Sequence, residues 1–309
     1  MIDIIDLKKS YGNNTVLNGI NISLESGKIY GFLGMNGSGK TTTMNILSGF
    51  MQPTNGDVII DGISMKSNPL EAKKLIGYLP ETPPLYNDMT VYEYLIFVAT
   101  AKGMSKADAK KEVAEKMSSV FCDSVKDKLI SNLSKGFRQR VGICSALIGN
   151  PKYILLDEPT SGLDPAQIVE IRELLLSLKK KHTVIFSSHI LSEISEVCDN
   201  ILILSNGNII KYNEQYNCFN TIVELKTSDS VTSDISNKYD VQLISKNEDT
   251  VKFRVKSDYD IRDKVFNFCV ENNITLIGLL LEKNSLEEVF LNTLRNETDC
   301  EENNNASDL

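Results

Sequence analysis

The chain has no tryptophan and two histidines, and its basic residues are outnumbered by acidic ones, 33 against 41. A net charge of −8 argues against a nucleic-acid-binding protein, which needs a basic surface. No apolar run approaches the roughly 18 residues that cross a bilayer. The short, acidic N-terminus does not resemble a secretory signal. We therefore expect a soluble chain that would serve a membrane process only by docking onto another protein.

Cysteine pairs are also missing. The six cysteines are scattered, without C-x-x-C spacing or a neighbouring histidine cluster: Cys122, Cys144, Cys198, Cys218, Cys269 and Cys300. This pattern predicts reduced thiols in a cytosolic protein rather than a disulfide or zinc framework. A length of 309 residues allows one large domain and a smaller one.

The most informative stretch present is residues 34–41, which fits the phosphate-binding pattern G-x-x-x-x-G-K-[ST]. An apolar run that predicts a strand (29–33) precedes it, and a predicted helix opens at Thr42. Glycines let successive N–H groups turn toward an anion, and the helix N-terminus favours negative charge. Lys40 is expected to reach the β- and γ-phosphates of a nucleotide, and Thr41 to bind Mg²⁺. The alternative is a glycine-rich turn that binds nothing. The residues predicted to hold the nucleotide here are Gly34, Met35, Asn36, Gly37, Ser38, Gly39, Lys40, Thr41 and Thr42.

A second segment supplies two carboxylates. The apolar run 153–156 predicts a buried strand, and Asp157 and Glu158 follow it directly. Ligands of open α/β sheets bind at this edge of the strands. We expect Asp157 to hold Mg²⁺ and Glu158 to orient and deprotonate the attacking water, a role typically worth about 10² to 10⁴ in rate. The alternative is a strand that ends in a solvated acidic turn.

Residues 1–213 alternate short apolar strands with helices, which predicts an α/β domain around a largely parallel sheet. A helical insertion is expected at about 90–150, with helices at 90–101, 106–120 and 137–148. A further helix is predicted at 165–181, capped by Asp164 with Pro165 in its first turn. Asn206-Gly207 predicts a hairpin turn between strands 201–205 and 208–212.

The remainder reads as a second, smaller unit. A polar linker is predicted at 214–221, followed by a small accessory domain at 222–295 with the order βαββαβ, typical of a ferredoxin-like α+β fold. Its strands are expected at 222–226, 241–244, 251–255 and 274–281, and its helices at 231–238 and 261–272. A last helix begins at the capping box Ser285-Leu286-Glu287-Glu288. We expect the acidic tail 296–309 to be disordered.

With these two motifs in place, residues 1–213 resemble the ATP-binding subunit of an ABC transporter, a P-loop NTPase. That family carries the signature L-S-G-G-Q between the two motifs, and residues 133–140 read Leu-Ser-Lys-Gly-Phe-Arg-Gln-Arg. The resemblance implies that Ser134 and Gly136 contact the γ-phosphate held by a second copy, so the chain would act as an ATP-bound dimer. Without it, both residues would be read as an ordinary helix N-cap. Asp164 lies in a segment similar to the family's D-loop at the same interface.

Two more residues take roles from the resemblance. His189 lies where the family has a switch histidine that bonds the γ-phosphate and the catalytic water. Tyr11 precedes the P-loop at the distance of the aromatic residue that stacks on adenine, although it can also be read as a turn residue. The other histidine, His182, is expected to be a solvated helix end.

The sequence departs from the family in two places. Aligning residues 76–80 with the segment before the family's Q-loop places Glu81 where a glutamine is expected. A carboxylate near the γ-phosphate is repelled unless Mg²⁺ or water mediates, so Glu81 is predicted to ligate the metal. In the signature, Lys135 and Phe137 replace the family's residues, which affects the expected rate rather than the function.

The resemblance implies a Mg²⁺-dependent ATPase with two partners, a second copy of itself and an integral-membrane permease, located at the inner face of the cell membrane. The motif variants at 77–81 and 133–140 and the end of the second unit are similar to the branch that powers drug, antibiotic, sodium or polysaccharide export. Two other classes stay open. One is a soluble ABC ATPase outside transport, and the other is an ATP-gated module that does not hydrolyse, which the presence of Glu158 disfavours. The second unit either braces the dimer or senses a ligand.

Overall fold

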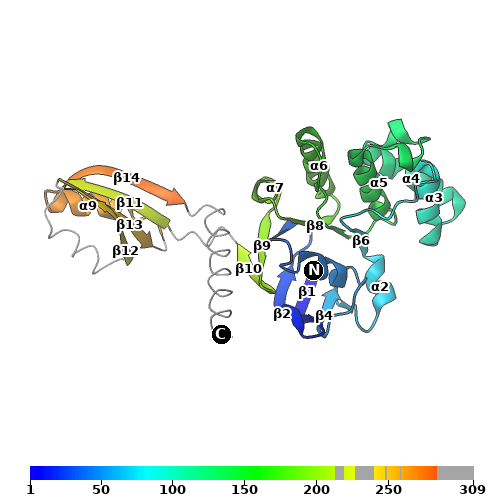
Figure 1. The fold of residues 1–309 in the computed structure, drawn as a ribbon, viewed down its shortest axis with the longest axis horizontal. Helices are drawn as coiled ribbons and strands as arrows, with labels where there is room; N and C mark the ends of the chain where they lie inside the picture. Colours follow the sequence, from blue (N-terminus) through cyan, green and yellow to red (C-terminus); the bar gives the residue numbers. More distant parts are fainter. Residues whose placement is uncertain (213–218, 227–239, 248, 258, 284–309) are drawn as a thin grey trace, which may run out of the picture. The chain divides into compact units, whose positions relative to one another are not determined.

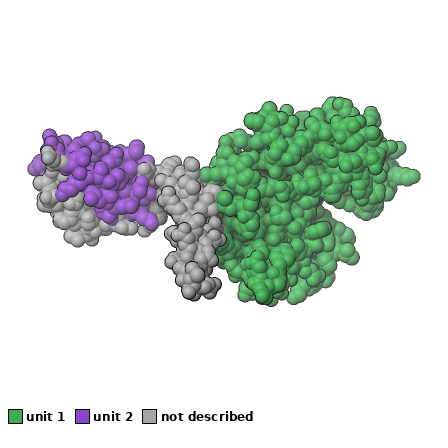
Figure 2. Space-filling model, in the orientation of Figure 1, with its two compact units in different colours: residues 1–211 green, residues 212–309 purple. Residues whose placement is uncertain are grey.

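We describe a computed structural model of the chain over residues 1–212, 219–226, 240–247, 249–257 and 259–283. It divides into two compact units, Met1–Lys211 and Tyr212–Leu309 (Figure 2). Each unit has its own hydrophobic core, and each is described by itself.

The central sheet of the first unit has six strands (Figure 1). Their order is β10 (Asn208–Tyr212), β9 (Asn200–Ser205), β3 (Ile29–Leu33), β8 (Thr183–Ser188), β7 (Tyr153–Leu156) and β6 (Ile76–Leu79). From β9 to β6 every neighbouring pair is parallel. All residues of β3, β7 and β8 are buried, as expected for strands covered on both faces. Because parallel strands end at one edge, the segments that follow β3, β7 and β8 are brought together there.

The prediction of one largely parallel sheet was incomplete for this unit. A second, antiparallel sheet of four strands has the order β2 (Asn14–Leu24), β1 (Ile2–Tyr11), β4 (Asn55–Ile60), β5 (Ile63–Ser64). One core joins the two sheets, since Ile2 and Ile4 of β1 cluster with Met44 and Leu47 of α1 (Lys40–Leu47) and with Phe32 of β3. The helix that follows the P-loop is thereby packed into the core that the two sheets share.

Three helices form the predicted insertion and pack on one another: α3 (Val91–Ala101), α4 (Lys106–Ser119) and α5 (Lys135–Leu147) (Figure 1). Two single 3₁₀ turns, Asp123–Val125 and Ile130–Asn132, connect α4 to α5. A capping box between Thr90 and Glu93 starts α3. The third helix begins two residues before the predicted position, because the Ser134 hydroxyl caps it by accepting the Phe137 N–H.

The remaining helices of this unit are α2 (Pro69–Lys74), α6 (Pro165–Leu178) and α7 (Leu191–Ser195). The cap of α6 is the predicted one, with Asp164 accepting the Gln167 N–H at 2.9 Å. Its predicted end at residue 181 was wrong, and so was the solvated state of His182. That ring is buried and Nδ1 lies 2.7 Å from the Pro151 carbonyl oxygen, a contact that ties the chain to the start of β7.

The second unit contains an antiparallel sheet in the order β12 (Asp240–Lys246), β13 (Thr250–Ser257), β11 (Phe219–Lys226), β14 (Thr275–Lys283), with α9 (Arg262–Glu271). Val223, Phe253 and Val255 pack against Val265 of α9. Strand β11 takes up residues 219–221 of the predicted linker. The predicted helices at 231–238 and from 285, and the tail 296–309, lie outside the described residues, so the ferredoxin-like fold stays a prediction.

No helix within the described ranges is long and apolar enough to cross a membrane.

Candidate nucleotide-binding site

The loop between β3 and α1 has the backbone that its glycines allow. Gly37 and Gly39 adopt φ values of 86° and 103°, which residues with a Cβ rarely reach. At Gly34 a Cβ would come within 2.5 Å of the Leu204 carbonyl oxygen, so the loop lies directly against β9. The buried Lys40 ammonium donates to the carbonyl oxygens of Gly34 and Met35 at 2.9 and 3.1 Å. The loop is thus folded around the Lys40 ammonium.

The acidic pair follows β7 at the same edge of the sheet, and a buried serine of β8 holds it. The Ser187 hydroxyl donates to Oδ1 of Asp157 at 2.5 Å and accepts the backbone N–H of Glu158 at 2.8 Å. Glu158 adopts φ 47°, a left-handed conformation that costs free energy for a residue with a Cβ. Ser187 therefore fixes both the Asp157 carboxylate and the strained backbone of Glu158.

The Glu158 carboxylate lies between two other predicted residues. Its Oε1 is 3.4 Å from Lys40 Nζ, and its Oε2 is 2.9 Å from Nδ1 of His189. The Glu158 side chain is 9% exposed and that of His189 44%, so the acid is shielded and the imidazole is open to solvent. An ionised carboxylate can only accept, which places a proton on Nδ1 and leaves Nε2 of His189 free to bond a ligand. The arrangement suits a base held ready beside a phosphate site.

These groups surround a hollow of about 640 Å³. Residues of β2, of α1 and of the loops after β3, β6, β7 and β8 line it. Nine of them belong to the predicted set: Asn36, Gly37, Gly39, Lys40, Thr41, Thr42, Glu81, Glu158 and His189. Glu81 follows β6, is exposed and lines the hollow, and its role as a metal ligand stays a prediction. The volume and the lining fit a nucleotide triphosphate tail better than a small uncharged ligand.

The residues predicted to bind Mg²⁺ fit a hard cation. Asp157 is fully buried, and its Oδ2 has no hydrogen-bond partner among the described residues. A buried carboxylate oxygen without a donor is costly unless a cation or water satisfies it. Burial and, to a lesser degree, the nearby charge of Asp157 raise the pKa of Tyr78. The phenol is therefore neutral and does not offer the cation a second anionic ligand. Thr41 and Asp157 would hold Mg²⁺ with Glu81 close by, and bound Mg²⁺ would neutralise charge on the phosphates.

Eight predicted residues are not in the lining of this hollow. Gly34, Met35 and Ser38 belong to the P-loop and Asp157 directly follows β7, and the other four are Tyr11, Ser134, Gly136 and Asp164. Tyr11 ends β1, 46% exposed, with its hydroxyl donating to the sulfur of Met51 at 3.0 Å. Ser134 and Asp164 each cap a helix, as described above. Gly136 is buried against Gln167, where a Cβ would come within 2.8 Å. In one chain Ser134, Gly136 and Asp164 do not line the hollow, so their predicted roles across a dimer stay predictions, and so does the stacking of Tyr11 on adenine.

The sequence reasoning missed several residues around the site. Asn14, Val16 and Ser161 line the hollow, and Ser187 positions the acidic pair from the neighbouring strand. For Ser187 a signal was present, since a polar residue directly after the apolar run 184–186 of a predicted strand needs a partner. No signal in one sequence pointed to Asn14 or Val16, because their strand β2 was not recognised.

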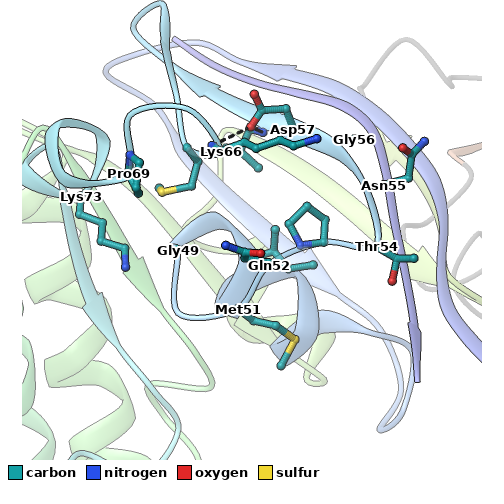
Figure 3. Close-up of a pocket in the computed structure, with 14 residues that line it drawn as sticks. Gly49, Met51, Gln52, Thr54, Asn55, Gly56, Asp57, Lys66, Pro69 and Lys73 are labelled. Atoms are coloured by element: carbon teal, nitrogen blue, oxygen red, sulfur yellow. Dashed lines mark hydrogen bonds between the residues drawn. The ribbon is translucent and has the colours of Figure 1, made fainter. Parts of the chain in front are cut away.

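A second hollow, of about 230 Å³, lies at the start of β4 and shares no lining residue with the first (Figure 3). Lys66, Lys73 and Met51 are among the residues that line it. The Asp57 carboxylate there accepts the Ser64 hydroxyl at 2.5 Å. It also accepts the Lys66 N–H at 3.2 Å (Figure 3). Asp57 thereby holds β4 to β5. Because the two hollows share no lining residue, this one is separate from the phosphate site.

Comparison with known proteins agrees with the geometry. The model of the family described as ABC transporter matches residues 17–161. The chain is 35% identical over 302 residues to the bacitracin transport ATP-binding protein BcrA of Bacillus licheniformis, covering 94% of this chain and 96% of that protein. It is 38% identical over 211 residues to the lantibiotic transport ATP-binding protein SrtF of Streptococcus pyogenes, covering 68% of this chain and 89% of that protein. The linearmycin resistance ATP-binding protein LnrL of Bacillus subtilis is 30% identical over 304 residues, with 94% and 97% covered.

Solved structures match the first unit. An ATP-binding subunit of an ABC transporter has a TM-score of 0.62 and 30% identity, covering 69% of this chain and 90% of that chain. A dimeric ATP-binding cassette in a post-hydrolysis state with ADP and Pi has a TM-score of 0.63 and 27% identity, covering 69% and 98%.

Proposed function

Because this chain belongs to the ATP-binding proteins of ABC transporters and is an ATPase coupled to transport, we propose that it powers the export of antibiotics or related small solutes through a separate membrane permease. The observation that carries the proposal is the match to a bacitracin transport protein along 94% of the chain, which extends beyond the ATPase unit. Fold alone would not choose a direction of transport. The names of the relatives support export of antibiotics.

In the proposed reaction the P-loop binds the triphosphate of ATP, with Lys40 on the β- and γ-phosphates. Glu158 accepts a proton from the attacking water, and the Nε2 of His189 holds the γ-phosphate. The distances support this assignment, since Glu158 lies 3.4 Å from Lys40 and 2.9 Å from His189. When phosphate enters, it draws Lys40 toward itself and frees one carboxylate oxygen for water.

We further propose that two copies close around two ATP molecules. Ser134, Gly136 and Asp164 would then meet the nucleotide held by the other copy, and Tyr11 would stack on adenine of its own. The positions of Ser134 and Asp164 at the exposed starts of α5 and α6 leave their surroundings open to a partner. This arrangement explains how one chain can carry a signature that lies apart from its own P-loop.

Docking to the permease would place the chain at the inner face of the cell membrane. We assign the contact to the segment around Glu81 and to α3 and α4. Tyr86, Phe97 and Leu129 are exposed in this region, and the rings of Tyr86 and Phe97 pack 5.5 Å apart. Exposed aromatic residues of this kind favour a protein interface.

The first test is Mg²⁺-ATP turnover of the full chain beside Glu158→Gln, with gel filtration in ATP. We expect the variant to lose about 10² to 10⁴ in turnover and to elute as an ATP-bound dimer. Ser195→Ala, a change on the exposed side of α7, serves as the matched control and should behave as wild type. If both Glu158→Gln and wild type bind ATP and neither turns over, even with the permease present, the chain is an ATP-gated module instead.

Export is tested separately in a host that expresses the chain with its permease. Resistance to a panel that includes bacitracin, a lantibiotic and linearmycin should rise with wild type and return to the host's level with Glu158→Gln. Turnover without any change in resistance across the panel would retain the ATPase and reject antibiotic export.

A further inference from the structure

Strand β8 ends in two consecutive serines, Ser187 and Ser188. Their side chains point to opposite faces of the sheet, as those of successive strand residues do. Ser187 bonds Asp157 and Glu158, as described above. Ser188 turns the other way, and its hydroxyl donates to Oε2 of Glu193 at 2.7 Å. Ser187 therefore bonds the acidic pair that follows β7, whereas Ser188 bonds a carboxylate on α7.

Glu193 is a buried acid that the proposed reaction does not use. It is 4% exposed and forms no ion pair among the residues that the structure describes. Its Oε2 accepts a second hydroxyl, that of Thr160, also at 2.7 Å, while its Oε1 has no partner in the described ranges. Burying a carboxylate without a cation costs stability, and an apolar side chain would fill this place at lower cost. Stability alone therefore does not explain an acid here.

Its two partners explain the position better. Thr160 follows Glu158 by two residues, and Ser188 directly precedes His189. Ser188 also accepts the N–H of Ile190 at 3.0 Å, which fixes the turn that carries the histidine. Glu193 thus ties the segment after β7 to the segment after β8. These are the two segments whose side chains meet in the Glu158–His189 hydrogen bond.

We propose that Glu193 is a positioning residue for ATP hydrolysis, acting through Thr160 and Ser188 to hold Glu158 and His189 in register. Glu193 does not line the nucleotide hollow, and its role is to keep the two segments at a fixed separation. Errors of about 1 Å in such a site can cost on the order of 100-fold in rate. The proposal rests on the roles given above to Glu158 and His189.

The test is steady-state hydrolysis by the full chain with four substitutions in two matched pairs. Glu193→Ala and Thr160→Val remove a hydrogen-bonding group, whereas Glu193→Gln and Thr160→Ser keep one. We expect kcat to fall about 10- to 100-fold in the first pair and to stay within about threefold of wild type in the second. The KM for ATP and the Kd of a fluorescent ATP analogue should change less than about twofold in all four, since the P-loop is untouched.

A double variant adds a readout that a merely structural role would not give. If Thr160 and Glu193 act as one unit, Thr160→Val with Glu193→Ala should be no slower than the worse single variant. Ser195→Ala on the same helix is the control and should equal wild type.

Three outcomes would overturn the proposal. The first is full turnover in Glu193→Ala. The second is a loss of kcat in Glu193→Ala and Thr160→Val together with an equal loss of analogue binding. The third is a double variant whose loss is the product of the single losses. Each of these can be observed while wild type hydrolyses ATP and Glu158→Gln does not, so failure here is distinguishable from failure of the proposed function.

Discussion

Replacing Ser187 with alanine tests whether one buried hydroxyl holds the acidic pair of this ATPase. Ser187 is fully buried, so alanine leaves the packing of β8 nearly unchanged and removes the hydroxyl. The change deprives Asp157 Oδ1 of its donor and the Glu158 N–H of its acceptor. Asp157 Oδ2 has no partner among the described residues, so the carboxylate would be left without any described hydrogen bond.

The magnitude follows from those two losses. A hydrogen bond to a charged group contributes about 1.5 to 3 kcal/mol, and a buried N–H left unpaired costs about 1 to 3 kcal/mol. Their sum is about 4 kcal/mol for Ser187→Ala. In a unit of roughly 200 residues each kcal/mol lowers the melting temperature by about 2 to 4 °C, so we expect a fall of about 8 to 16 °C. Turnover should fall about tenfold as well, because the strained backbone of Glu158 loses its restraint.

The assay is thermal unfolding without nucleotide, followed by turnover at a temperature where the variant is folded. The matched control is Ser177→Ala, because the Ser177 hydroxyl bonds only to Leu174 O of its own helix among the described contacts. That control should melt within about 2 °C of wild type, in line with a loss of about 0.5 kcal/mol. A Ser187→Ala melting temperature equal to that of Ser177→Ala would refute the reasoning. A lower melting temperature with unchanged kcat would make Ser187 a residue of stability alone.

Three further predictions concern other parts of the first unit. Gly34→Ala should weaken binding of an ATP analogue at least about tenfold by calorimetry, because the new Cβ would lie 2.5 Å from Leu204 O and Ser38 Oγ; unchanged affinity would contradict the close packing. Burial lowers the pKa of His182 from its ordinary 6.5, so the unfolded chain takes up the proton first. Stability is then complete above about pH 6.5 and falls as the pH drops through the folded-state pKa, and His182→Asn should melt with a flatter dependence between pH 8 and 5. Burial raises the pKa of Cys122 to about 12, so its alkylation, followed by peptide mass mapping, should be slow until denaturant is added.

Much of the site was predictable because its chemistry is local in sequence. The P-loop needs glycine at fixed positions, and Gly37 and Gly39 do adopt positive φ. The strand before Asp157 and Glu158 could be recognised from apolar residues alone, since both faces of β7 are buried. Such patterns fix the backbone within about ten residues, and parallel strands then bring their ends together.

What escaped prediction depends on contacts between distant segments. β1 pairs with β2 and also with β4, which begins 53 residues after the start of β1, and neither partner follows from the pattern of β1 itself. His182 follows a run of lysines and looked solvated, yet the Pro151 carbonyl draws it inside. In both cases the deciding partner was far along the chain, and composition gave no indication of it.

The polar residues behind the acidic pair show why a motif alone does not make an active site. Glu158 and His189 are readable in sequence, but their 2.9 Å contact is supported by hydroxyls of β8 and of the segment after β7 and by an acid on α7. Ser187 restrains the backbone of the base, while Ser188, Thr160 and Glu193 restrain the segments on either side. A chain could keep every motif residue and lose turnover by changing this second set. Variation in the buried hydroxyls, rather than in the motifs, is therefore where differences in hydrolysis rate between related ATPases should arise.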